Sequence, residues 1–341
     1  MNVYPFLEAC WRRPVSRRPV WIMRQAGRYM PQYQDIRGQV DFLTLCKTPE
    51  LATRVTLLPV ELLGVDAAIL FSDILIPLEP MGISVDFKDG VGPVLSPVRD
   101  EKAIRALKDI EPEQDVPFVP EALRMIRAEL EGKTPLIGFS GSPFTLATYA
   151  VEGGTSKSFH NIKSLLYSRP DLADLLVDKL AGVVTSYLNA QIHAGAQAIQ
   201  IFDTWGGILA EEEYLRFAFA PLKKILAGLD RKITPVIYYL NNGAHLARHM
   251  NALDVEVLGI DWRQDIGQVR RTLGQKKAVQ GNLDPAVLFA PREEVRARAH
   301  RLLNAAGPEP GHIFNLGHGI LPATPMDNAI ALVEAVHEYQ D

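Results

Sequence analysis

The chain has 341 residues, 47% of them apolar, so it can bury a large core as one or two domains. Its formal net charge of −4 gives no sign of nucleic-acid binding, and two cysteines, Cys10 and Cys46, are too few for a disulfide framework or a zinc cage. We expect a soluble cytoplasmic protein, because the sequence shows no signal peptide and no apolar run of about 18 residues.

Positive charge is concentrated at the start of the chain. Residues 1–37 contain seven arginines and only two acidic residues, Glu8 and Asp35. Such a field suits a small anionic molecule, although a solvated arm would have the same composition. We expect residues 1–18 to form an arm, with four of these arginines in solvent: Arg12, Arg13, Arg17 and Arg18.

An apolar run at residues 20–23 leads directly into the sequence RQAGR, residues 24–28. We interpret the run as a buried strand that ends in polar residues. Arg24 and Arg28, four residues apart, offer two rigid guanidinium groups to carboxylates or phosphates. The alternative is a pair of solvated surface arginines.

Eight short apolar runs recur along the chain, and segments with helical periodicity lie between them. The runs are residues 20–24, 67–71, 135–139, 198–202, 235–240, 255–260, 278–281 and 312–316. Strands rich in Ile, Val and Leu that alternate with helices indicate a parallel sheet. Eight such units predict an α/β protein with one closed (β/α)8 TIM barrel over residues 1–341, whose functional groups stand at the C-terminal ends of the strands.

Polar residues or glycine follow every run. They are, in chain order, Arg24, Gln25 and Arg28; Ser72 and Asp73; Ser140, Gly141 and Ser142; Asp203 and Thr204; Asn241, Asn242 and Gly243; Asp261; Asn282 and Asp284; and Gly317, His318 and Gly319. Eight polar strand ends around one rim predict a polar binding site on rigid supports. Residues 74–96 do not fit the repeat and are expected to form an excursion with short strands after the second barrel strand.

Five motifs in this order resemble uroporphyrinogen decarboxylases, over nearly the whole length of the chain. They are PVWIMRQAGRYM at 19–30, LFSDILI at 70–76, GFSGSPFTLATYAVEGG at 138–154, IFDTWGG at 201–207 and FNLGHGI at 314–320. The resemblance implies a distorted (β/α)8 barrel and a homodimeric carboxy-lyase without a metal or other cofactor. Such an enzyme converts the four acetate side chains of uroporphyrinogen III to methyl groups in haem biosynthesis, releasing coproporphyrinogen III and CO2. We expect no membrane or nucleic-acid partner.

The resemblance also implies roles for individual residues. Asp73 matches the carboxylate that accepts hydrogen bonds from the pyrrole N–H groups, and Arg24, Tyr149 and Asp73 form the expected catalytic set. Further substrate contacts fall on Arg28, Thr204, His318 and the backbone N–H groups of Gln25 and Ala26. Each has a structural alternative: Asp73 as a helix N-cap, Tyr149 and Thr204 as satisfied buried hydroxyls, and His318 as part of a glycine-rich turn.

Two other functions fit part of the pattern. Zinc- and corrinoid-dependent methyltransferases resemble this family in architecture, but they need cysteine ligands at strand ends, and the turn after the fifth run reads YLNNGAH. A non-catalytic tetrapyrrole carrier would use the same binding site without releasing CO2. A phosphate-binding barrel enzyme fits less well, because NLDP at 282–285 is not a glycine-rich phosphate loop.

Overall fold

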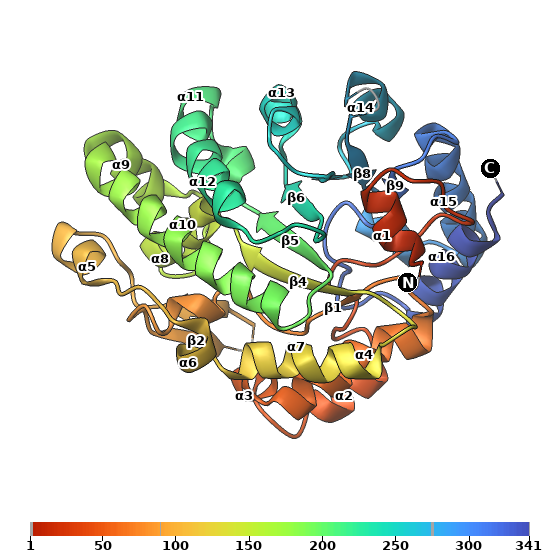
Figure 1. Cartoon of the computed structure of the whole chain (residues 1–341), viewed down its shortest axis with the longest axis horizontal. Coiled ribbons are helices and arrows are strands. Elements are labelled where there is room, and N and C mark those ends of the chain that lie inside the picture. Colours follow the sequence, from red (N-terminus) through yellow and green to blue (C-terminus); the bar gives the residue numbers. More distant parts are fainter. Residues whose placement is uncertain (1–2, 89, 274–275, 341) are drawn as a thin grey trace.

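A curled parallel sheet of seven strands lies at the centre of the molecule, and helices cover its outside (Figure 1). The structure, a computed structural model, describes residues 3–88, 90–273 and 276–340. In sheet order the strands are β1 (Ala68–Ile69), β4 (Leu136–Gly141), β5 (Ala198–Asp203), β6 (Val236–Leu240), β7 (Val257–Ile260), β8 (Ala278–Gln280) and β9 (His312–Ile313). The α/β barrel-type fold predicted from the sequence is therefore confirmed.

Helices connect the strands and precede the sheet. They are α1 (Pro5–Cys10), α2 (Pro31–Arg37), α3 (Phe42–Lys47), α4 (Pro49–Leu63), α5 (Glu101–Ala106), α6 (Pro112–Asp115), α7 (Phe118–Glu129), α8 (Pro143–Glu152), α9 (His160–Ser168), α10 (Pro170–His193), α11 (Glu211–Tyr214), α12 (Ala220–Gly228), α13 (Ala247–Asn251), α14 (Ile266–Leu273), α15 (Arg292–Ala306) and α16 (Met326–Glu338). None of the helices in the described ranges is long and apolar enough to cross a membrane.

The first predicted strand, residues 20–24, is wrong in extent. Only Val20 pairs, in a parallel bridge with Phe314 just after β9, and its carbonyl also accepts the Asp66 N–H at 2.7 Å. Val20 therefore connects the β9 edge of the sheet to the segment that leads into β1. The strand stops because the chain turns at once: Arg24 has a left-handed backbone, with φ at +63°. The other seven predicted runs each contain a strand.

The strands are short and fully covered, as expected for a parallel sheet between helices and a filled interior. Every residue of β4 and β6 is buried. Inside the ring, Trp21 Nε1 donates to Gln280 at 2.8 Å, and Gln280 Nε2 donates to Gln200 on β5 at 3.1 Å. These side chains come from the residue after Val20, from β8 and from β5, so the hydrogen-bonded series crosses the barrel interior.

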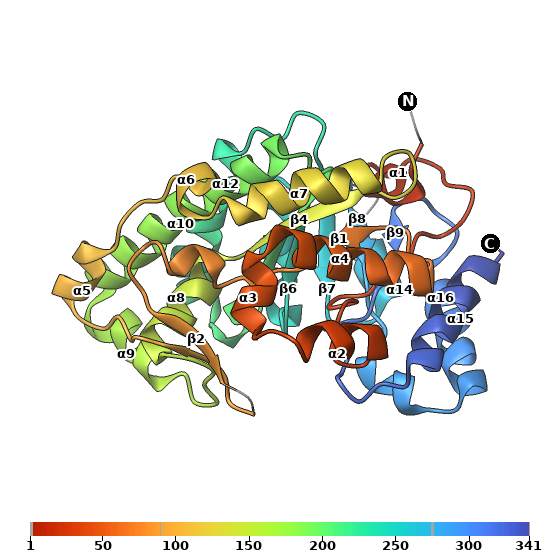
Figure 2. The same ribbon diagram turned by 90° about the horizontal axis from the view of Figure 1, so that it is seen from below.

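Residues 74–96 contain a 3₁₀ helix (Ile76–Leu78) and a β-hairpin formed by β2 (Val85–Lys88) and β3 (Gly92–Leu95). The segment contacts the last turn of α8, next to α9 (Figure 2). Leu95 N donates to Gly153 O at 3.0 Å. Directly after the segment, Val98 N donates to Ala150 O at 2.9 Å and Arg99 Nε to Val151 O at 2.8 Å. The last carbonyls of a helix have no partner within it, so this segment caps α8.

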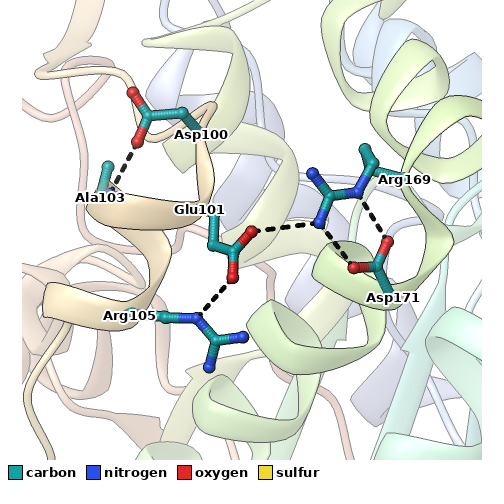
Figure 3. Close-up of polar contacts among 6 residues, drawn as sticks. All are labelled: Asp100, Glu101, Ala103, Arg105, Arg169 and Asp171. Carbon is teal, nitrogen blue, oxygen red and sulfur yellow. Dashed lines mark hydrogen bonds and ion pairs between the residues drawn. The ribbon is translucent and has the colours of Figure 1, made fainter.

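Exposed charges join the chain after the hairpin to the start of α10 (Figure 3). Asp100 caps α5 by accepting from Ala103 N at 2.8 Å, and Glu101 accepts from Arg105 at 2.8 Å and from Arg169 at 3.2 Å. Arg169 also binds Asp171 through two hydrogen bonds. The bonds from Arg105 and Arg169 lower the pKa of Glu101. Because solvent screens such pairs, they fix the position of α5 more than they stabilise the fold.

The prediction that four arginines of the arm lie in solvent is wrong for Arg18, which is buried, and holds only in part for Arg12, whereas Arg13 and Arg17 are exposed. Arg18 is buried and donates to Gly307 O at 2.5 Å, Arg12 donates to Lys277 O at 3.1 Å, and Arg17 pairs with Asp66 at 2.5 Å. Guanidinium groups bond readily to carbonyls that are left unpaired at loop ends, which the local sequence does not reveal. The arm is therefore part of the wall on the N-terminal side of the sheet.

Asp66 is the central group of this wall. Its buried carboxylate accepts from Val20 N at 2.8 Å, contacts His337 Nε2 on α16 at 2.8 Å, and pairs with Arg17. One side chain therefore joins the N-terminal segment, the start of β1 and the last helix.

We expect Asp66→Ala to lower the free energy of unfolding by about 3 kcal/mol, because it leaves a buried N–H and two side-chain donors without their acceptor. Urea titration followed by circular dichroism measures the change. Asp327→Ala is the matched control, since Asp327 is exposed and its nearest cation, on Arg292, is 3.9 Å away; its effect should stay within about 0.5 kcal/mol. Equal effects of the two substitutions would contradict the role given to Asp66.

Candidate active site

The turn that carries Arg24 is built around Gln25. The Gln25 side chain accepts from Ile22 N at 3.1 Å and donates to Ala67 O at 3.0 Å, while its own N–H donates to Ile22 O at 2.8 Å. Both of these donors are already used by the protein. Gln25 is buried and holds the turn against the segment before β1. The contact of the Gln25 N–H with a substrate carboxylate stays a prediction.

The loop after β9 holds the same turn from the other side. Asn315 Oδ1 accepts from Met23 N at 2.9 Å, and Ile320 N donates to Met23 O at 2.9 Å. The Arg24 side chain crosses Gly319 so closely that a Cβ there would lie 2.4 Å from Arg24 Cδ. Only glycine allows this approach. Arg24 and the neighbouring His318 consequently belong to one rigid unit.

Asp73 lies in the loop after β1. Its Oδ1 accepts from Leu75 N at 2.9 Å, so part of the predicted capping role exists, as a turn before the 3₁₀ helix. Within the described part of the chain, Asp73 Oδ2 accepts no hydrogen bond. Burial raises the pKa of Asp73, and the Leu75 N–H and the charge of Arg24 oppose this rise. One carboxylate oxygen thus remains for a ligand.

The buried carboxylate of Asp203 joins α8, which carries Tyr149, to the chain after β5, which carries Thr204. Asp203 Oδ1 accepts from Thr145 Oγ1 on α8 at 2.8 Å, and Thr145 Oγ1 accepts from Trp205 N at 3.1 Å. These bonds join α8 to the end of β5. The Tyr149 ring lies 5.9 Å from the Trp205 ring, between centroids. Burial and the charge of Asp73 raise the pKa of Tyr149, so its hydroxyl stays protonated and can donate.

His318 is a neutral hydrogen-bond donor in this setting. Its Nδ1 accepts from Gly319 N at 2.8 Å, which leaves the proton on Nε2. Burial lowers the pKa of His318 to about 4, and the positive charges of Arg24 and Arg263 contribute to this. At neutral pH the ring can therefore offer Nε2–H to a carboxylate without carrying charge.

Arg24 connects the predicted site residues electrostatically. Its charge acts on the pKa of Asp73 in the loop after β1, of Tyr149 on α8 and of His318 in the loop after β9. The structure thus brings three predicted residues into electrostatic range of Arg24. Neither Arg24 nor Arg28 forms an ion pair with any residue in the described ranges. Both are exposed.

The remaining predicted residues are less closely connected. Arg28 lies in the same turn as Arg24, and its carbonyl accepts from Gln34 at 2.6 Å. Ala26 and Thr204 are partly exposed, and the Thr204 carbonyl accepts weakly from Asn241 at 3.4 Å. No interaction joins these three residues to Asp73 among the residues described. Their roles stay predictions.

The sequence analysis missed the residues that position the site. Asn315 and Trp205 lie inside quoted motifs, but an amide and an indole carry no signal of what they contact. Ser140 and Gly141, expected after the third strand, lie within β4. Cys10 and Cys46 are buried in α1 and α3. The described ranges contain no group of three His, Cys, Asp or Glu residues that could hold a metal ion.

Comparison with known proteins identifies the family of the chain. The family model described as uroporphyrinogen decarboxylase (URO-D) matches residues 2–339. The chain belongs to the uroporphyrinogen decarboxylase family. Its relatives include uroporphyrinogen decarboxylases of Geobacter sulfurreducens, 52% identical, and of Trichlorobacter lovleyi, 51% identical; each alignment covers 97% of both chains. The resemblance seen in the motifs is confirmed.

Solved structures with other activities share the fold of this decarboxylase family member. A methyltransferase from Methanosarcina mazei superposes with a TM-score of 0.80 over 98% of this chain and 97% of its own, at 22% identity. A putative vitamin-B12 independent methionine synthase from Listeria monocytogenes gives a TM-score of 0.60 at 11% identity, covering 97% of this chain and 98% of its own. These likenesses concern the architecture only.

We expect the pKa of His318 to lie near 4 in a ¹⁵N NMR titration, with the proton on Nε2 above it. The unfolded chain binds this proton near pH 6.5, so the contribution of His318 to stability is complete above pH 6.5 and is lost as the pH falls towards 4. Wild type should therefore lose more stability than His318→Gln between pH 7 and pH 5. A pKa of 6.5 in the folded protein would contradict this assignment.

Proposed function

We propose that this protein removes the carboxyl groups of the four acetate side chains of uroporphyrinogen III, giving coproporphyrinogen III and CO2 in haem biosynthesis. Family membership supports the activity. The structural observation that carries the proposal is Asp73, which keeps one carboxylate oxygen without a protein partner beside the unpaired cation Arg24. This combination suits a substrate that presents N–H donors at its centre and carboxylates at its edge.

Asp73 would supply the electrostatic stabilisation that the reaction needs. Loss of CO2 from an acetate leaves an electron pair on carbon, and a pyrrole protonated at a ring carbon can accept that pair. The positive charge of the protonated ring is stabilised by an anion at its N–H groups, so the carboxylate contributes most in the transition state. Pyrrole N–H groups would also hydrogen-bond to the ionised form of Asp73 and offset the pKa rise that burial causes.

Arg24 and Arg28 would bind substrate carboxylates. Both guanidinium groups have unused N–H donors, and bidentate arginine–carboxylate pairs are strong and directional. We do not assign proton donation to Arg24 itself, because a guanidinium group is a very poor acid near neutral pH. A water molecule bound to Arg24 could deliver the proton instead.

Tyr149, Thr204 and His318 would complete the carboxylate contacts. Tyr149 and His318 both carry a proton on the relevant atom at neutral pH, and both are within the field of Arg24. Neutral donors bind a carboxylate without opposing its release as CO2, since they form no ion pair that departure of the charge would break. A homodimer and a cytoplasmic location follow from the resemblance and the sequence and stay predictions.

The decisive experiment is anaerobic incubation of the metal-stripped protein with uroporphyrinogen III, followed by oxidation and separation of the products by carboxyl number. A ladder from eight carboxyl groups to four would establish the activity without any added cofactor. An octacarboxylate that is bound but unchanged would favour a carrier. A protein that neither binds nor converts it, or that needs zinc, would point to methyl transfer.

We expect Asp73→Asn to retain the fold and to lose turnover by roughly 10²- to 10³-fold, because the amide cannot stabilise the cationic pyrrole. Initial rates of heptacarboxylate formation measure the loss, and circular dichroism checks the fold. The matched control is Asp109→Asn, an exposed aspartate after α5 that should leave turnover unchanged. Near-normal turnover of the Asp73 variant would remove the proposed electrostatic role.

A further inference from the structure

Among the described residues, a third arginine whose guanidinium group donates no hydrogen bond stands at the same edge of the sheet, two residues after the polar end of β7, with Asp261 as a loose ion-pair partner at 3.4 Å. The guanidinium carbon of Arg263 lies 4.0 Å above the centre of the Trp262 ring, in a cation–π contact. The side chain is 46% exposed. The indole therefore fixes the orientation of the charge while solvent still reaches it.

The hydrogen-bond donors of Arg263 are unused. The nearest acid, Asp261, is already satisfied: its Oδ2 accepts from Asn242 N at 2.6 Å and its Oδ1 from Arg263 N at 2.8 Å. Nη1 of Arg263 stays 3.4 Å from Asp261 Oδ1, which is long for a charge-assisted hydrogen bond. In the described part of the chain, no acceptor takes a hydrogen bond from the guanidinium group. Its five N–H donors are available to a ligand.

Arg263 faces the site already described. The Trp262 ring meets His318 edge-on, with centroids 6.2 Å apart at 84°. Gly317 lies so close that a Cβ there would be 2.3 Å from Trp262 N, which ties the loop after β9 to the loop after β7. Arg263 and Arg24 both act on the pKa of His318 and of Tyr239. The two arginines therefore share one electrostatic environment.

The sheet order sets Arg263 far from Asp73 around the rim. Starting from Val20, the ring runs through β1, β4, β5, β6, β7, β8 and β9 before it returns to Val20. Asp73 follows β1 and Arg263 follows β7, so four steps separate them in either direction. Arg263 therefore lies across the rim from Asp73, the residue proposed to bind the central N–H groups, and a group that it binds belongs to the edge of the macrocycle.

We infer that Arg263 is a further substrate-binding residue, which holds a propionate carboxylate at the part of the rim opposite Asp73. The inference rests on the proposed function. The acetates disappear one by one over the four decarboxylations, whereas every propionate remains. Arg263 can bind a substrate carboxylate in all four decarboxylations only if that carboxylate belongs to a propionate. Arg263 then orients the ring without taking part in the loss of CO2.

The test compares wild type with Arg263→Ala and Arg263→Lys, using octacarboxylate and pentacarboxylate porphyrinogens as separate substrates. We expect Arg263→Ala to raise KM about tenfold for both substrates and to change kcat by less than about twofold, as loss of a charge-assisted hydrogen bond predicts. The KM of Arg263→Lys should lie between those of wild type and Arg263→Ala, because lysine keeps the positive charge but lacks the planar guanidinium group that stacks on Trp262.

A matched control is available on the outer surface. Arg216 also stacks on an aromatic ring, with its guanidinium carbon 5.0 Å from the centre of Phe217, but it pairs with Asp174 on α10. Arg216→Ala should leave both KM values unchanged. Thermal unfolding of each variant checks that the fold is intact.

Three results would overturn the inference. With an active wild type, unchanged KM values in Arg263→Ala would show that the residue binds no substrate. An increase in KM for the octacarboxylate alone would show that Arg263 binds an acetate rather than a propionate. A wild type that converts neither porphyrinogen would refute the proposed function, and the inference with it.

Discussion

The position of Arg24 depends on a single residue of parallel pairing, at Val20. This residue joins the β9 edge to the start of β1, and it is fixed from below by the Asp66 carboxylate. Three residues later the chain is fixed again, through hydrogen bonds of Met23 to Asn315 and Ile320. Such a short strand would be unstable alone, because backbone pairing gains little per residue. Hydrogen bonds to the side chains of Asp66 and Asn315 add stability to this short pairing. They hold the turn that carries Arg24 at the position where the sheet closes.

At the rim, the acidic side chains and the arginines form most of their hydrogen bonds with different partners. Two buried acids at strand ends, Asp203 and Asp261, accept hydrogen bonds from backbone N–H groups and hydroxyls, and Asp261 forms only a loose 3.4 Å ion pair with Arg263. Arg24, Arg28 and Arg263 are consequently left without carboxylate hydrogen bonds in the described structure. Leaving cations unpaired costs little while water reaches them. An anionic ligand that displaces this water gains their full interaction.

Much of the fold and part of the site could be predicted from the sequence. Apolar runs marked seven strands, since a buried parallel strand reads as Val, Ile and Leu in a row. Arg24, Asp73, Tyr149 and His318 were identified through the family motifs, and they do share one electrostatic environment. The extent of the first strand was missed, because the left-handed backbone of Arg24 leaves no mark on the sequence. The bracing role of the Gln25 side chain could not be predicted, since in a sequence an amide that braces a turn looks the same as one that binds a ligand. Arg263 was overlooked because its significance depends on Trp262 and on a sheet order that only the three-dimensional structure provides.

Two of the four tryptophans of the chain stand at the rim, on different sides of it. Trp205 contacts Tyr149, and Trp262 contacts His318 and Arg263. Trp21, by contrast, is completely buried and donates its indole N–H to Gln280 inside the barrel. The protein therefore carries its own fluorescent probes. We expect the emission of Trp205 and Trp262 to change when a ligand binds at the rim. Replacing one of these two tryptophans at a time assigns the change to the other. The buried indole serves as an internal reference for the integrity of the core.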